Sequence, residues 1–315
     1  MTKVNGRRFL RWRTCSIFLD DSQLVLCSIP LLAQEGWRSH NQIIFRSIMS
    51  QQYPLSSDPL LLKQVHAMLE QESTTYRVSR DYFRRVGDAG DWDAEVEVSP
   101  STRAMMLSWG YQIAESCKLK RNVAIYAMGY MDRFLSNSCS PSAQTVLSNQ
   151  YDFQLCFITC ILIAMKNYSG LSVELDFASK IVCNGIYSVQ ELSAMEMHVL
   201  QGLEWRLNGP SPIDFVHAFV QMLPPQEKTV LDAMIRVSEA LVEAAIMDYS
   251  LMLQSSPSSM AYASILAASE CLNFSYSNPL EWATWKQCIA RITGLPEDNF
   301  TVQATKGTLI SSFMN

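Results

Sequence analysis

Hydrophobic residues recur at helical spacing along most of the chain from about Pro59 onward, and the alternation typical of a half-buried β-strand is nowhere sustained. The first run, between residues 60 and 69, predicts an amphipathic helix that opens the ordered part of the protein. Residues 71–100 then mix charge, glycine and proline and include an acidic stretch at 88–93. They are predicted to form a linker or loop.

Five helical segments follow this loop. The first begins at Pro100 and carries Met105 and Trp109 one turn apart, and the third is hydrophobic nearly all round, which predicts that it lies at the centre of a domain. The fifth starts at Ser188, and Glu191 three residues later completes a capping-box pattern. The predicted helices cover residues 100–117, 122 to before 141, 151–167, 173–184 and 188–207.

A short, stiff break at Asn208–Pro212 separates these helices from a second set. Prolines fall at or beside the starts of the later helices, where proline is tolerated. The second set is predicted at residues 212–222, 226–250, 257–273, 279–293 and 297–313. The pattern predicts an all-α protein with a flexible N-terminal extension (1–58), a first domain with its preceding helix (59–207) and a second domain (208–315).

Composition narrows the classes of partner. The chain of 315 residues has a net charge of −5 and a pI of about 5.5, so it lacks the basic footprint of a nucleic-acid-binding protein. Charged residues make up 17% of the chain, compared with ~25% in a typical globular protein. The lower charged fraction leaves more neutral surface for contact with a protein partner. We therefore expect no nucleic acid among its ligands.

The N-terminus superficially resembles a signal peptide, because basic residues precede an apolar stretch from Ser22 to Ala33. Asp20 and Asp21 stand just before this stretch, Pro30 interrupts it, and it is too short to cross a bilayer. We expect no membrane association. A signal sequence, a nuclear import signal and a disordered start are the three interpretations left open for the basic cluster.

Cysteine and histidine usage argues against a metal centre. None of the nine cysteines forms a C-x-x-C pair, and none of the four histidines clusters with a cysteine. The closest pair, Cys156 and Cys160, lies inside an apolar run and is predicted to be buried as small hydrophobic residues. We expect no metal and no cofactor, and reduced thiols suit a protein of the nucleus and cytoplasm.

The sequence from Thr102 to Ser136 resembles the opening of a cyclin box. Its last part, Tyr130-Met-Asp-Arg-Phe-Leu-Ser136, matches the family signature position by position, and residues 203–216 resemble the junction to the second repeat, nearest to D-type cyclins. The resemblance covers about residues 60–315. It implies two consecutive five-helix cyclin-fold repeats and a regulatory subunit that activates a cyclin-dependent serine/threonine protein kinase and so controls cell-cycle progression.

The resemblance also implies roles for individual residues. Arg103 and Asp132 match the arginine and aspartate that pair inside the first repeat, where they hold its first two helices together. Lys166 and Glu196 match the lysine and glutamate of the kinase-facing surface, to which Trp205 would add apolar contact. Lys166 also ends a helix just before Gly170, so an alternative is that it only neutralises the helix dipole.

A groove that docks substrates or inhibitors with arginine-x-leucine motifs is implied as well. Its matching residues are Met105, Met106, Trp109, Gln112, Phe153 and Gln154. Gln112 replaces an acidic residue of the family and Thr102 a methionine, which predicts weak docking. After Lys166, the residues Asn167, Tyr168 and Ser169 replace an aromatic and two acidic residues, which leaves the choice of kinase open.

Other functions fit the sequence less well. Val123-Ala-Ile-Tyr126 is similar to the kinase strand motif but has tyrosine in place of the essential lysine, and the sequence shows no His-Arg-Asp, Asp-Phe-Gly or nucleotide-binding fingerprint, so we expect no enzyme activity. A transcription factor of the same helical fold would need a basic face and often a zinc ribbon. A protein-binding scaffold that activates no kinase is a further alternative.

Overall fold

The computed structural model describes residues 59–78, 81–83, 98–136, 141–223, 226–274 and 279–314, the side chains to residue 311, and the backbone of three short N-terminal strands. Strand β1 (Lys3–Val4) pairs antiparallel with β2 (Arg7–Arg8), and β3 (Val25–Leu26) pairs antiparallel with β4 (Leu171–Ser172). The rest of the predicted flexible extension, 1–58, lies outside the described residues.

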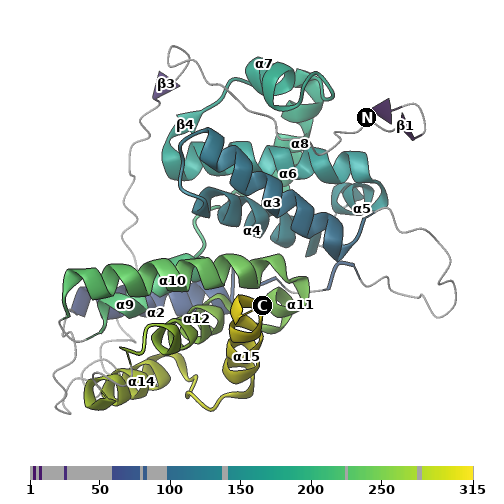
Figure 1. Cartoon of the computed structure of the whole chain (residues 1–315). Helices are drawn as coiled ribbons and strands as arrows, with labels where there is room; N and C mark the ends of the chain where they lie inside the picture. Colours follow the sequence, from purple (N-terminus) through teal and green to yellow (C-terminus); the bar gives the residue numbers. More distant parts are fainter. Residues whose placement is uncertain are drawn as a thin grey trace, which may run out of the picture.

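The first domain is a bundle arranged around one buried helix (Figure 1). Helix α6 is buried along nearly its whole length and packs against α4, α5 and α8, as its all-round hydrophobicity predicted. Helix α3 starts at a capping box in which the Ser99 hydroxyl accepts a hydrogen bond from the Thr102 N–H. The helices are α3 (Pro100–Ser116), α4 (Asn122–Ser136), α5 (Pro141–Ser148), α6 (Gln150–Ala164), α7 (Leu175–Phe177) and α8 (Val189–Gly202), with π-helical turns η2 (Met165–Ser169) and η3 (Ala178–Val182).

The second domain repeats this plan around α12. Alanine and serine dominate the buried face of α12, which allows α9, α10 and α15 to approach it closely. Helix α2 (Pro59–Ser73) precedes the first domain in sequence but lies beside α9 of the second (Figure 1). The other helices are α9 (Pro212–Gln221), α10 (Lys228–Met247), α11 (Tyr249–Gln254), α12 (Pro257–Cys271), α14 (Pro279–Thr293) and α15 (Phe300–Met314).

The predicted all-α fold is confirmed, and several element boundaries are corrected. The predicted helix 173–184 is the short α7 followed by a π-helical turn, and the predicted helix 226–250 divides at Asp248, whose side chain caps α11. Helix α8 ends at Gly202 instead of 207, because Glu204 and Trp205 adopt the left-handed conformation, at φ of 52° and 59°. Helix α5 was not predicted, although Pro141 stands at its start.

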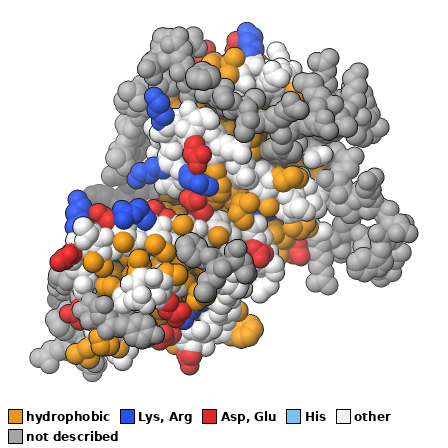
Figure 2. Space-filling view, viewed as in Figure 1, with side chains coloured by type: hydrophobic (Ala, Val, Ile, Leu, Met, Phe, Trp, Pro, Cys, Tyr) orange, Lys and Arg blue, Asp and Glu red, His pale blue; other side chains and the backbone are white. Residues whose placement is uncertain are grey.

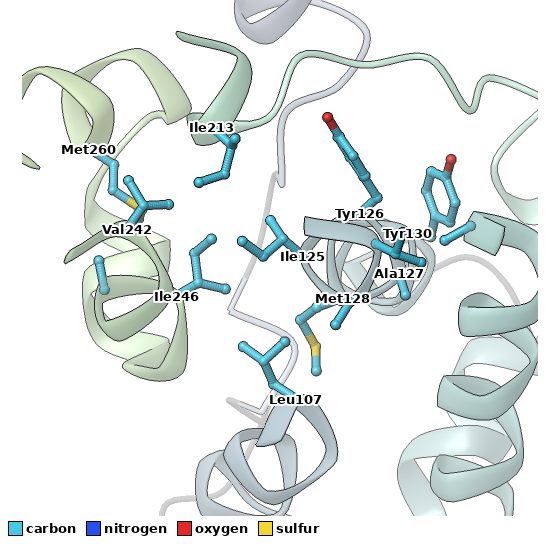
Figure 3. Packing of buried hydrophobic residues seen from close by; sticks show 14 of the residues in the cluster. Leu107, Ile125, Tyr126, Ala127, Met128, Tyr130, Ile213, Val242, Ile246 and Met260 are labelled. Atoms are coloured by element: carbon cyan, nitrogen blue, oxygen red, sulfur yellow. The ribbon is translucent and has the colours of Figure 1, made fainter. Parts of the chain in front are cut away.

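The two domains pack directly on each other. Ile125 of α4 points toward Ile213 and Ile246 of the second domain, whereas Tyr126 and Tyr130 leave α4 on another side (Figure 3). Polar contacts surround this apolar centre: the Tyr126 hydroxyl donates to Asp214 Oδ1 at 2.8 Å, and Arg121 pairs with Glu243 at 3.1 Å. Acidic and basic side chains accordingly mingle along the domain boundary in Figure 2, while hydrophobic side chains gather over the second domain. The two repeats therefore share one continuous core.

Among the described residues, no single helix is both long enough and apolar enough to span a membrane. Only the bent pair formed by Pro141–Ser148 and Gln150–Ser169, which meet at 118°, reaches the necessary length and apolar composition. The α6 part of this pair is the buried centre of the first domain.

Candidate functional site

Lys166 and Glu196 are brought together by helices α6 and α8. Lys166 lies in η2, directly after α6, and its Nζ is 2.6 Å from Oε1 of Glu196 on α8. Their side chains are 34% and 20% exposed, so both are accessible at the surface while bonded to each other. Glu196 is itself a partner for the Lys166 charge, so the lysine has more than a capping role at the end of α6.

Exposed apolar side chains lie on α8 and in the turn that follows it. Met197 follows Glu196 and is 46% exposed, and Trp205 is 61% exposed. Trp205 has a left-handed backbone at φ 59°, which costs a non-glycine residue ~1–3 kcal/mol and is held here by its N–H, which donates to the Leu200 carbonyl. A strained turn that presents a large exposed aromatic side chain is typical of a binding surface.

Asn167 and Tyr168 tie the end of α6 to the interdomain hinge. The Asn167 amide donates to the Tyr130 hydroxyl at 3.1 Å and to Asn208 Oδ1 at 2.8 Å, and the Tyr168 hydroxyl donates to the Leu207 carbonyl. The Tyr168 ring also stacks on Tyr126 with centroids 3.6 Å apart, and burial raises the pKa of Tyr168 to about 12. Asn167 and Tyr168, which replace an aromatic and an acidic residue of the family pattern, thus have an internal structural role.

Arg103 and Asp132 form a bidentate ion pair in the interior. Arg103 is fully buried, its Nε and Nη2 donate to the two carboxylate oxygens of Asp132 at 2.8 Å each, and its Nη1 donates to the Ile246 carbonyl at 2.7 Å. Burial alone would lower the pKa of Arg103, but the Asp132 charge and its hydrogen bonds outweigh burial and the net shift is upward. The pair joins α3 to α4 and, through Ile246, to the second domain.

Tyr82 was missed because the segment before α3 was predicted to be only a linker. Its hydroxyl donates to Asp132 Oδ1 at 2.6 Å, and its N–H donates to the Tyr249 hydroxyl at 3.1 Å. The Tyr249 hydroxyl in turn donates to Asp81 Oδ1, and the Phe83 ring packs 4.7 Å from the Tyr249 ring. The only sequence signal was an aromatic pair, Tyr82-Phe83, inside a charged stretch.

The predicted peptide groove divides into an accessible part and a buried part. Met105 and Gln112 are exposed and Trp109 is partly exposed, and their spacing places them on one face of α3. The side chains at the other three positions lie in the core, so the prediction that they contact a docked peptide would require them to become accessible. The buried residues are Met106 (0% exposed), Phe153 (0%) and Gln154 (2%, with Oε1 accepting from the Tyr187 hydroxyl).

No group of three or more His, Cys, Asp or Glu side chains that could hold a metal ion occurs among the described residues. The buried thiols are Cys156, Cys160 and Cys183, and burial raises the pKa of Cys183 to about 12, so its thiol stays protonated.

Comparison with known proteins identifies the family. The N-terminal cyclin domain matches residues 64–208 and the C-terminal cyclin domain matches residues 210–305. Since these two domains account for most of the chain, the protein belongs to the cyclin family.

The relatives include G1/S-specific and G2/mitotic-specific cyclins. The chain is 28% identical over 214 residues to human G1/S-specific cyclin-D1, which covers 68% of this chain and 66% of the relative. It is 25% identical over 207 residues to G2/mitotic-specific cyclin-2 of Antirrhinum majus, covering 65% of this chain and 42% of the relative. The match thus spans slightly less than two thirds of the human relative's length.

The fold is also similar to that of a solved viral cyclin from herpesvirus saimiri. That likeness covers 81% of this chain and 98% of the viral chain, with a TM-score of 0.56 and 17% sequence identity. It supports the two-repeat cyclin fold already visible in the helix arrangement.

Proposed function

We propose that this cyclin is the activating regulatory subunit of a cyclin-dependent serine/threonine protein kinase that controls cell-cycle progression. The observation that carries the proposal is the Lys166–Glu196 pair at the surface, with Met197 exposed on the same helix and Trp205 exposed in the turn that follows it. A charged pair and exposed apolar side chains together have the composition of an interface, where a few residues supply most of the binding energy.

Activation would follow from binding. The surface formed by Lys166, Glu196, Met197 and Trp205 would grip the kinase's movable C-helix and bring its glutamate to the ATP-site lysine, and the activation segment would be drawn aside. A rigid activator suits this task, since it shifts the kinase equilibrium only by its differential affinity for the active state. The shared core and the buried Arg103 network provide that rigidity.

The chain itself would catalyse nothing. We expect the purified protein to bind no ATP and to phosphorylate no histone, but to raise the activity of a captured cyclin-dependent kinase by orders of magnitude. The measurement is affinity capture of the full chain from cells, identification of the bound kinase and a histone phosphorylation assay with and without added chain. A kinase that binds but gains no activity would favour the scaffold alternative, and tight ATP binding by the chain alone would contradict the proposal.

Substrate docking on α3 gives a separate prediction. Gln112 is exposed on the same face as Met105 and Trp109, and it offers a neutral oxygen to the arginine of an arginine-x-leucine peptide. In the variant Gln112→Glu that hydrogen bond becomes charge-assisted, worth ~1 kcal/mol more, so peptide affinity should rise roughly fivefold.

Titration of a labelled arginine-x-leucine peptide measures this gain, and Gln201→Glu on α8, also at an exposed glutamine, is the matched control. An equal affinity for wild type and Gln112→Glu would show that the peptide arginine does not reach this position.

A further inference from the structure

A cleft of about 490 Å³ lies between the two domains, and Lys166, Glu196, Met197 and Trp205 are not among its lining residues. Its walls come from the end of α2, one side of α4, the hinge at 207–212 and the connection between α11 and α12. Both its volume and its place at a domain junction are typical of ligand sites, which span ~300–1,000 Å³. The cleft is therefore large enough to hold several side chains of a partner.

Two arginines at this cleft have no carboxylate partner among the described residues. Arg133 is half-buried on α4, stacks over the Tyr76 ring at 4.6 Å and donates only to the Arg206 carbonyl. Arg77 is exposed in the segment that follows α2, four residues after Ser73. Burial lowers the pKa of Arg133, which shows that this guanidinium is held away from water without a compensating negative charge.

The acidic groups that line the cleft are already engaged. Asp132 is bound by Arg103, and the Glu72 carboxylate accepts hydrogen bonds from the N–H and the hydroxyl of Ser258. Burial raises the pKa of Glu72, and its hydrogen bonds to Ser258 partly oppose that shift. Because Asp132 is neutralised by Arg103, the two arginine charges are opposed by the Glu72 carboxylate alone, and the net positive field favours an anionic ligand.

The floor of the cleft has room beside these charges. A Cβ built on Gly129 of α4 meets no atom within 4 Å, so the helix leaves an open notch at this position. Tyr76 and Tyr168 provide aromatic surface next to it, and Ser255 and Ser256 opposite have extended backbone with ψ of 131° and 157°. Extended backbone, aromatic walls and a notch together suit an extended peptide better than a compact small molecule.

We propose that the cleft between the cyclin repeats docks an extended peptide through an anionic side chain that pairs with Arg133 and Arg77. The anion is the carboxylate of glutamate or aspartate, or the phosphate of a phosphorylated serine or threonine, since both offer oxygens to a guanidinium fork. The site lies on the hinge side of the molecule and uses none of the residues Lys166, Glu196, Met197 and Trp205.

The experiment uses the full chain, without a kinase, and four degenerate ten-residue peptide pools whose central position is glutamate, phosphoserine, glutamine or lysine. Retention on immobilised protein is compared between pools. We expect the glutamate or the phosphoserine pool, or both, to be retained about fivefold more than the glutamine pool, since a charge-assisted bond replaces a neutral one. Which of the two anionic pools is retained identifies the source of the anion.

Two variants locate the binding. Gly129→Trp fills the notch. Gly307→Trp, at an exposed position of α15 where a Cβ also meets no atom within 4 Å, is its matched control. Arg77→Glu reverses a charge at the rim, and Arg236→Glu on the exposed side of α10 controls for net charge. Gly129→Trp and Arg77→Glu should each abolish the preference for anionic pools, and the two controls should keep it.

Equal retention of all four pools by the wild-type chain would overturn the proposal, as would a preference that persists in Arg77→Glu. Thermal melting identifies any variant that fails to fold, and Arg77→Glu then decides the question, because no hydrogen bond or ion pair of the described structure depends on that side chain. Since no kinase is present, the outcome is independent of the proposed kinase activation.

Discussion

The variant Lys166→Glu is expected to lose kinase capture and activation while it keeps the fold of the wild type. The substitution removes a bond of 2.6 Å and places a second negative charge against Glu196, so both side chains swing apart and the centre of the surface becomes repulsive. Truncation at an interface centre costs ~2 kcal/mol or more, which weakens binding roughly thirtyfold, and Lys166→Glu should exceed Lys166→Ala.

A matched control exists in the second domain. Lys286 and Glu297 form a second lysine–glutamate pair of the same 2.6 Å length, with the lysine 23% and the glutamate 42% exposed. Lys286→Glu should change stability about as much as Lys166→Glu but leave kinase binding intact. The measurements are thermal melting of each free variant and kinase capture with a phosphorylation assay.

Two results would contradict this interpretation of the Lys166 surface. One is a Lys166→Glu variant that melts like wild type and activates the kinase fully. The other is a variant that unfolds, while Lys286→Glu does not, which would make the pair a structural contact.

The largest effect on stability is expected at the buried Arg103–Asp132 pair. Among the described residues, Arg103→Met leaves the buried Asp132 charge with the Tyr82 hydroxyl as its one remaining side-chain donor, and it removes the Arg103 donor from the Ile246 carbonyl. Removing one partner of a buried pair costs ~3–5 kcal/mol, a large fraction of the ~5–15 kcal/mol that holds a domain together. We expect a marked fall in the denaturant midpoint.

The double variant Arg103→Met with Asp132→Leu separates charge burial from packing. It removes both charges and should recover part of the lost stability, because the cost of the single variant comes mainly from an uncompensated charge. Arg206→Ala is the control at an exposed pair, where Arg206 and Glu204 are 53% and 71% exposed, and it should cost at most ~1 kcal/mol. A single variant Arg103→Met as stable as this control would mean that the buried pair is dispensable.

A second measurement on Arg103→Met tests whether the buried network also holds the two domains together. Since Arg103 joins the first repeat to the Ile246 carbonyl, its loss should also loosen the domain contact, seen as faster amide exchange at the ends of α4 and α10.

The sequence by itself determined the helices and the family. A period of 3.6 residues in hydrophobic positions reports directly which side of a helix is buried, so the start of α2, α3 and α9 and the buried centre at α6 were predicted correctly. The signature at 130–136 and the landmarks Lys166 and Glu196 indicated a cyclin, and the family comparison confirmed this. Capping patterns such as Ser188 with Glu191 also form as predicted.

Only the tertiary structure decided which side chains meet and which are accessible. Burial of Met106, Phe153 and Gln154 follows from how α3, α6 and neighbouring segments pack, and a list of matching positions does not contain that information. The contacts of Tyr82 and Tyr249 with the Arg103 pair join residues far apart in sequence, and no local pattern encodes them.

The end of α8 and the interdomain cleft are also features that only the tertiary structure decided. Neither residue of the left-handed turn, Glu204 or Trp205, is a glycine, so the sequence did not predict the turn. Surrounding contacts, such as the hydrogen bond from the Trp205 N–H to the Leu200 carbonyl, hold the unfavourable backbone in place. The pairing of Arg133 with Tyr76, and the lack of a carboxylate at Arg133 among the described residues, depend on how the hinge brings two helical repeats together. Local propensity and periodicity determine where the helices form, whereas packing across the hinge determines which side chains meet and which are exposed.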